Sequence, residues 1–179
     1  RVEGEPGKTE MWYVVDAQPG AQLYYGFQRE LTREEAARRI ADGTLTDVLN
    51  AVPVKAGDVF FIDAGTVHAI GAGILIAEIQ QTSDITYRIY DFNRRDANGN
   101  TRELHTELAK EAIDYTVLPD YRTHYTPAQN CGVELVSCPY FTTTLYDLTQ
   151  ARTIDLSSLD SFLVVICMGG HAHPQHRRR

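Results

Sequence analysis

Residues 57–71 read GDVFFIDAGTVHAIG and combine two turn signals with two short strand patterns. A Gly-Asp pair and an Ala-Gly pair predict tight turns, and the β-branched and aromatic run 59–62 between them is typical of a strand. His68 follows the second turn with apolar neighbours on both sides, which favours an inward-facing ring because side chains alternate along a strand. A buried imidazole needs partners for its nitrogens, so His68 is either a hydrogen-bonded core residue or a metal ligand.

Short strand patterns separated by turn residues continue along the chain. They lie at 11–17, 21–27, 59–63, 67–70, 74–80, 86–92, 133–138, 141–148 and 161–168. Gly, Asp, Asn and Pro stand between them, which is typical of an antiparallel sandwich or barrel. We therefore expect a mainly β protein.

Two helices interrupt the strand patterns. Thr32 and Glu35 form a capping box that opens an amphipathic helix through Ile40, and Leu45, Val48 and Leu49 predict a further short helical turn. Another amphipathic pattern runs from 101 to 115, with apolar residues on one stripe and charges on the other. We expect this second helix to pack on the surface.

The order of these patterns predicts two β-domains, the second incomplete. Residues 1–115 form a β-barrel with helical insertions, and a Pro- and Tyr-containing linker occupies 116–132. Residues 133–168 then supply the first strands of a C-terminal β-domain. The tail 169–179 has no hydrophobic pattern and is interpreted as disordered or introduced by cloning. The chain begins at Arg1 without methionine, so both ends look cut.

Composition narrows the range of partners. The chain has 179 residues and a formal net charge of −7, which opposes nucleic acid. It contains no run of eighteen apolar residues, so no membrane span is expected. Its three cysteines form no CxxC pair and leave an odd thiol, which favours the reducing cytoplasm. The sequence leaves the oligomeric state open.

Polar residues gather on two strand patterns. One side of the strand pattern that follows His68 carries Glu78, Gln80, Thr82 and Asp84. This side is either a solvated face or a binding face. Near the start, Lys8 and Glu10 share a face two residues apart, either as a surface ion pair or as an inward carboxylate beside an amine.

Two stretches closely resemble a known family. GKTEMWYVVDA at 7–17 and the segment 55–115, from KAGDVFFIDAGTVHAIG to ELAKEAIDY, resemble the type I mannose-6-phosphate isomerases in their shorter bacterial form, and the resemblance covers about 7–168. The string G-D-x(6)-G-x-x-H that ends at His68 is also similar to the second cupin motif. The resemblance implies a cupin-type antiparallel β-barrel, or jelly roll, and a zinc-dependent aldose–ketose isomerase acting on mannose 6-phosphate and fructose 6-phosphate.

The resemblance also implies roles for individual residues. Glu10 and His68 would be ligands of one zinc ion per chain. Lys8 would line the pocket, while Glu78 and Arg88 would flank the sugar. Arg88 would stabilise charge on the reacting oxygens, and the base would be Glu78, Lys8 or a zinc-bound water. Arg94, with Arg88 and Lys8, would bind the sugar phosphate.

One departure from the family bears on metal binding. Family members carry a Q-x-H-P motif upstream of K-T-E with two further zinc ligands, and nothing before Lys8 reads Q-x-H. Zinc sites use three or four protein ligands, so we expect residues to be missing from the front of this chain. The alternatives are a metal-free or incomplete cupin that binds a sugar phosphate without catalysis, and another metal-dependent cupin enzyme.

Overall fold

The computed structural model describes residues 7–83, 85–91, 94–173 and 175. Predicted features at 1–6, at Asp84, at 92–93 and in most of 174–179 lie outside these residues. The elements follow in the order β1 (Glu10–Ala17), β2 (Gln22–Phe27), α1 (Arg33–Ala41), the 3-10 helix η1 (Leu45–Val48), β3 (Leu49–Pro53), β4 (Val59–Ile62), β5 (His68–Ala69), β6 (Ile74–Gln80), α2 (Thr106–Ala112), β7 (Gly132–Ser137) and β8 (Thr142–Tyr146).

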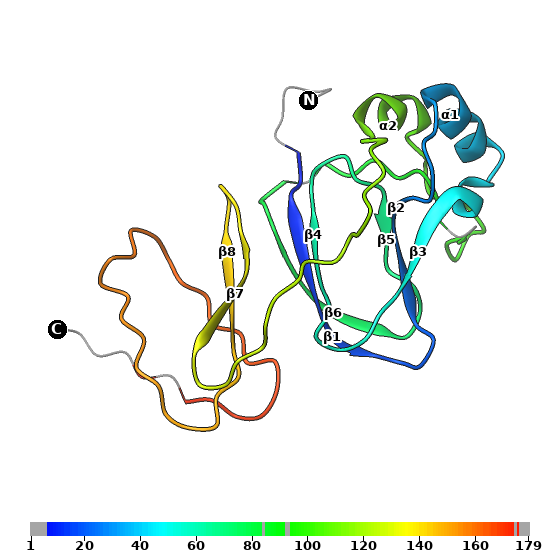
Figure 1. The fold of residues 1–179 in the computed structure, drawn as a ribbon. Coiled ribbons are helices and arrows are strands. Elements are labelled where there is room, and N and C mark those ends of the chain that lie inside the picture. The colour runs from blue at the N-terminus through cyan, green and yellow to red at the C-terminus, as the bar shows by residue number, and fades with distance from the viewer. Residues whose placement is uncertain (1–6, 84, 92–93, 174, 176–179) are drawn as a thin grey trace.

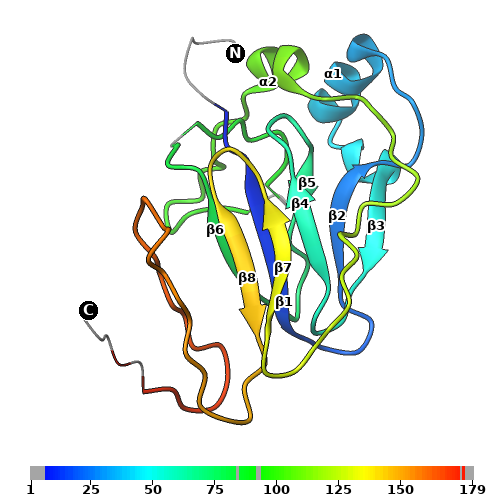
Figure 2. The same cartoon turned by 60° about the vertical axis from the view of Figure 1, so that its left-hand side comes forward.

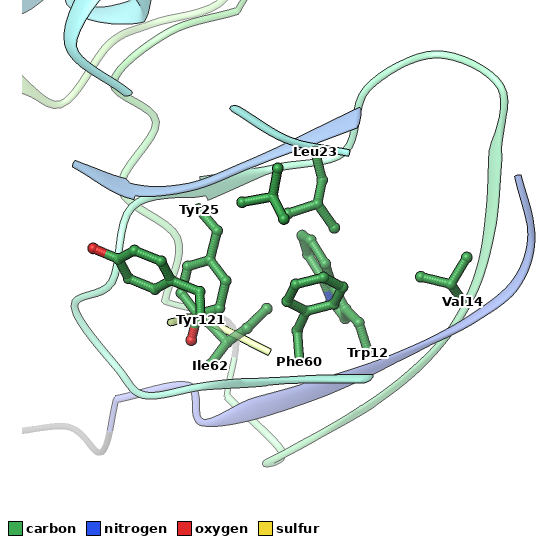
Figure 3. Close-up of a cluster of buried hydrophobic side chains, with 8 residues drawn as sticks. Trp12, Val14, Leu23, Tyr25, Phe60, Ile62 and Tyr121 are labelled. Carbon is green, nitrogen blue, oxygen red and sulfur yellow. The ribbon is translucent and has the colours of Figure 1, made fainter. Parts of the chain in front are cut away.

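Two antiparallel sheets face each other and enclose the main core. One has the strand order β4-β1-β6 and the other β3-β2-β5 (Figure 1). Trp12 and Phe60 from the first sheet meet Leu23 and Tyr25 from the second (Figure 3). Each large side chain buried in this way contributes roughly 1.5–3 kcal/mol to folding. The prediction of a mainly β, antiparallel fold is confirmed.

β1 is buried on both of its faces. Trp12 and Val14 point into the core between the sheets, whereas Met11 and Tyr13 point outward. The hairpin β7–β8 covers this outer face and packs Leu135 and Val136 against Met11 (Figure 2). Because both faces are covered, β1 is a nearly continuous apolar run rather than an alternating one.

The predicted linker 116–132 lies along the first sandwich. Tyr121 is part of the main core, and its hydroxyl donates to the carbonyl of Phe27 at 3.3 Å. Thr123 donates its N–H to the carbonyl of Val59 at 2.8 Å, and the hydroxyl of Tyr125 donates to the carbonyl of Gly57 at 2.8 Å. The domain boundaries at 115 and 132 stay a prediction.

The helices lie side by side at one end of the sandwich (Figures 1 and 2). α1 begins as predicted, with the Thr32 hydroxyl accepting the N–H of Glu35 at 3.1 Å. α2 is shorter than the predicted 101–115, since backbone contacts limit it at both ends. His105 donates its N–H to the carbonyl of Arg88 at 2.8 Å, and Asp114 donates its N–H to the carbonyl of Gly65 at 2.9 Å. Neither helix of the described chain has the length and apolar character needed to cross a bilayer.

Three local predictions are wrong. The pattern does not predict β3, and Leu49, assigned to a helical turn, instead begins this strand opposite Phe27. Residues 86–91 form no strand. Residues 161–168 pair with no other strand of the described chain and are exposed throughout, Phe162 to 85%. A β-like sequence forms a strand only where a neighbour completes its hydrogen bonds.

The turn that leads to His68 is held against the end of α2. Gly65 has φ +97°, and a Cβ built on it would lie 2.6 Å from the carbonyl oxygen of Ala112. A backbone oxygen cannot rotate away as a side chain can, so this position requires glycine for its space as well as for its backbone angle.

Replacement of Gly65 by alanine is therefore expected to destabilise the fold through two separate effects. Gly99→Ala is the matched control, because Gly99 also has a positive φ, +83°, but no atom within 4 Å of the position that a Cβ would take. We expect Gly99→Ala to cost about 1–2 kcal/mol for its backbone angle, and Gly65→Ala about 1–3 kcal/mol more for the clash. Urea denaturation of both variants measures the difference, and equal losses would contradict the steric role.

Candidate functional site

Glu10 is the single charged side chain that is fully buried in the described part of the chain. It opens β1 on the same face as Trp12, which turns its carboxylate into the space between the sheets, and it is 1% exposed. Its Oε1 lies 3.4 Å from Nζ of Lys8 and 3.8 Å from Nε2 of His68. No described group donates a hydrogen bond to Oε1. A buried carboxylate oxygen without a donor is costly unless a cation balances it.

His68 reaches Glu10 from the opposite sheet. β5 pairs with β2, so that His68 lies opposite Tyr25. The Nδ1 of His68 lies 2.8 Å from the carbonyl oxygen of Thr66. A carbonyl can only accept, so the proton is assigned to Nδ1, and Nε2 keeps its lone pair on the side of Glu10. Histidines that bind metals commonly have this second hydrogen bond to a backbone carbonyl.

The pair Glu10 and His68 fits two ligands of one ion. Two bonds of about 2.0–2.1 Å at a tetrahedral angle place the ligand atoms about 3.4 Å apart, and the observed separation of 3.8 Å is a few tenths of an ångström longer. The described residues contain no group of three His, Cys, Asp or Glu side chains arranged to hold a metal. They therefore bring together two of the three or four protein ligands that zinc normally uses.

Glu78 is connected to this pair through Trp12. Trp12 and Glu78 are neighbours across β1 and β6, and Nε1–H of Trp12 donates to Oε2 of Glu78 at 3.1 Å. The Trp12 ring also meets the His68 ring edge to face, with the centroids 5.2 Å apart. Glu78 is exposed and lies at the border of the core. Lys8, Glu10, His68 and Glu78 thus form one neighbourhood.

Arg88 lies outside this group of contacts. Its N–H donates to Nδ1 of His105 at 3.0 Å, and its carbonyl accepts from the N–H of His105 at 2.8 Å. Within the described residues, no hydrogen bond or ion pair joins its guanidinium to Lys8, Glu10 or His68.

Three arginines gather around Asp91. A hydrogen bond from Arg102, at 2.8 Å, is the main reason why the pKa of the Asp91 carboxyl lies below its ordinary value. The nearby charges of Arg94 and Arg88 lower that pKa further. The cluster has an excess of positive charge, which suits an anionic group.

Two residues that contact the candidate site residues, Trp12 and His105, were not identified from the sequence patterns. Trp12 shares the parity of Glu10, so the alternation of β1 could have indicated it. His105 is seventeen residues from Arg88, and no local pattern predicts their contact.

The chain is similar to named proteins over most of its length. It is 40% identical over 169 residues to the mannose-6-phosphate isomerase ManA of Bacillus subtilis, covering 93% of this chain and 53% of that protein. It is 42% identical over 173 residues to the mannose-6-phosphate isomerase of Streptococcus mutans, covering 94% and 52%. No model of a protein family matches the chain.

A solved structure agrees with these matches. The crystal structure of the mannose 6-phosphate isomerase from Bacillus subtilis superposes with a TM-score of 0.68 at 35% identity, over 78% of this chain and 45% of that one. The predicted cupin-type fold is thereby confirmed. The chain spans about half the length of the curated relatives it matches. By sequence and by fold, the resemblance to the mannose-6-phosphate isomerases is confirmed over about half of their length.

Proposed function

We propose that this chain contributes the active site of an aldose–ketose isomerase that interconverts mannose 6-phosphate and fructose 6-phosphate, with one zinc ion bound by Glu10 and His68. One observation supports the metal above all others. Among the described residues, the buried Oε1 of Glu10 accepts no hydrogen bond, has a single cation near it, the Lys8 ammonium at 3.4 Å, and faces the lone pair of His68 Nε2 at 3.8 Å. The names of the relatives supply the isomerisation and the substrate mannose 6-phosphate, and the family resemblance supplies the product fructose 6-phosphate.

Zinc bound to Glu10 and His68 would act as a Lewis acid on the sugar oxygens. The side chains around it have separate tasks. Lys8 lies 3.4 Å from Glu10 and brings a positive charge to the same group of side chains. Trp12 and the carbonyl of Thr66 limit the rotation of the His68 ring. These side chains are therefore held in position before a ligand binds.

The reaction moves a proton between C1 and C2 of the sugar, which requires a base near these carbons and positive charge near their oxygens. Glu78 is a candidate base, since Trp12 holds Oε2 and leaves Oε1 for another partner. Lys8 is the second candidate. Arg88 is the proposed cation for the reacting oxygens, because a guanidinium stays protonated. Arg94, in the arginine cluster around Asp91, is the proposed phosphate contact.

The proposed location is the cytoplasm and the proposed partner is a small sugar phosphate. All three cysteines are free, as a reducing compartment would keep them. The formal net charge of −7 gives no general attraction for an anionic substrate, so the arginine cluster has to supply it locally.

Metal binding is the first test of this proposal. The purified chain is titrated with zinc, and bound metal and thermal stability are measured with and without fructose 6-phosphate. We expect at most one zinc per chain, bound weakly because Glu10 and His68 are only two of the three or four protein ligands that zinc normally uses. A rise in Tm on binding and zinc-dependent conversion of the sugar phosphate should accompany it. His68→Ala is expected to abolish zinc uptake, whereas His124→Ala, which removes an exposed histidine paired with Asp120, should not.

Unchanged zinc content in His68→Ala would contradict the role of His68. Sugar-phosphate binding without zinc or turnover would favour the binding-only alternative. Absence of zinc, binding and turnover in the wild-type chain would overturn the proposal.

Glu10→Met is expected to separate stability from metal binding. Methionine fills a similar volume and removes the buried carboxylate whose Oε1 has no donor. The metal-free variant should therefore gain at most about 1–3 kcal/mol of unfolding free energy, the usual desolvation penalty of such a group, reduced by the attraction to the Lys8 ammonium at 3.4 Å that is lost with the carboxylate. The Tm increase on adding zinc should disappear. Glu103→Met, at an exposed glutamate, is the control and should change neither quantity. A less stable metal-free Glu10→Met would contradict this account.

Arg88→Lys is expected to bind zinc normally and to lose most of its turnover. A flexible ammonium group cannot reproduce the planar donor fork of a guanidinium. Removing one charge-stabilising donor costs about 10²–10³ in kcat, and because lysine keeps the charge, we expect a loss of at least about tenfold. Arg95→Lys is the control, because the Arg95 side chain donates to the carbonyl of Gly99 in an exposed loop. Turnover near the wild-type level in Arg88→Lys would remove Arg88 from the mechanism.

A further inference from the structure

Trp12 contacts site residues from both sheets at once. It stands two residues after Glu10 on the inner face of β1, and its side chain is buried in the main core (Figure 3). Its ring meets the ring of His68 on β5 edge to face, and its N–H donates a hydrogen bond to Glu78 on β6. A single side chain therefore joins a candidate metal ligand to a candidate base.

The contact with Glu78 selects one position for an otherwise exposed carboxylate. Indole has a single polar donor, and in Trp12 that donor is given to Oε2 of Glu78 at 3.1 Å. The two residues are also paired across the strands, so the backbone below the carboxylate is fixed as well. An exposed glutamate normally samples several rotamers. The hydrogen bond keeps Oε2 at the border of the core.

The contact with His68 is made by the ring of Trp12 and not by its N–H. The two rings meet at an interplanar angle of 81° with centroids 5.2 Å apart, a favourable aromatic geometry. On its other nitrogen, the His68 ring is held by the carbonyl of Thr66. Held on two sides, the ring keeps Nε2 on the side of Glu10.

We propose that Trp12 is a positioning residue of the isomerase site, which orients the Glu78 carboxylate through its N–H and the His68 imidazole through its ring. This inference rests on the function proposed above. The alternative is that Glu78 only satisfies the buried N–H of Trp12 and that this hydrogen bond has no part in catalysis. Removal of the N–H alone distinguishes the two, because it lowers kcat only if Trp12 positions Glu78.

Two substitutions separate the two contacts. Trp12→Phe keeps an aromatic ring beside His68 and removes the N–H. The candidate base Glu78 then loses its fixed position, so kcat is expected to fall about tenfold, with KM and zinc affinity unchanged. Trp12→Leu removes the ring as well, and its zinc affinity is expected to fall too. Phe60→Leu is the control, because it shortens an aromatic side chain of the same core whose ring partner is Tyr25. It should lower Tm and leave kcat unchanged.

A double-mutant cycle decides whether Trp12 acts through Glu78. If it does, Trp12→Phe lowers kcat in the wild-type background and has no further effect in the Glu78→Gln background. The proposal would be overturned if Trp12→Phe lowered kcat by the same factor in both backgrounds. It would also be overturned if Phe60→Leu lowered kcat as much as Trp12→Phe does.

A readout that needs no turnover comes from the fact that Trp12 is the chain's only tryptophan. In a ¹⁵N-labelled sample it gives a single indole N–H resonance. Glu78→Leu should shift this resonance and speed its hydrogen exchange, whereas Glu103→Leu should not. Zinc should shift it as well, since the neighbouring His68 ring would bind the ion.

The failures of the two proposals are distinguishable. If the wild-type chain neither binds zinc nor isomerises the sugar, the proposed function fails, while the Glu78→Leu spectrum still decides the Trp12–Glu78 contact. If the wild-type chain is active but Trp12→Phe matches it, or the indole resonance ignores Glu78→Leu, the positioning role of Trp12 is overturned.

Discussion

The side-chain alternation of β1 constrains the core, the hairpin contact and the candidate site together. Glu10, Trp12 and Val14 face the opposite sheet, and Met11 and Tyr13 face the β7–β8 hairpin. A shift of the strand by one residue would exchange these two sets. It would move a carboxylate and an indole into the outer contact and leave His68 without its neighbours. The hydrophobic burial that fixes this register therefore also fixes the site.

The candidate site lies where the two sheets meet, so it depends on contacts between residues far apart in the chain. Glu10 comes from the central strand of one sheet and His68 from the edge of the other. The turn at Gly65, held by the N–H of Asp114, connects the position of His68 to the end of α2. A buried carboxylate oxygen that accepts no hydrogen bond is unfavourable for folding alone. Such a conflict between local rules and burial is typical of functional positions.

Much of the local structure could be predicted from the sequence. The turn residues and the β-branched runs predicted most of the strands, and β6 has the same bounds, 74–80, as its pattern. The capping box at Thr32 predicted the start of α1 because the signal is contained in four neighbouring residues. The parity of Lys8 and Glu10 predicted that they share a face, and the structure brings them within 3.4 Å.

The features that the sequence could not predict depend on partners far along the chain. Residues 86–91 are apolar enough for a strand, but Arg88 pairs with His105 instead of with a sheet. The same contact prevents α2 from starting before Thr106. The link from Trp12 to both His68 and Glu78 joins three strands, and a periodicity within one strand carries no information about it. The roles of six residues stay predictions: Glu10, His68, Glu78, Arg88, Arg94 and Lys8. Their positions limit what each side chain could do, and measurements of metal binding and turnover are needed to assign the roles.

The exposed segment 161–168 has a practical consequence for handling the isolated chain. Its sequence SFLVVICM has no charge and no proline, and Val164, Val165 and Ile166 are all more than half exposed. Short uncharged segments rich in β-branched residues stack readily with copies of themselves. At high concentration this stretch would draw molecules together into aggregates, and one or two lysines introduced there would keep the chain dispersed without touching the sandwich.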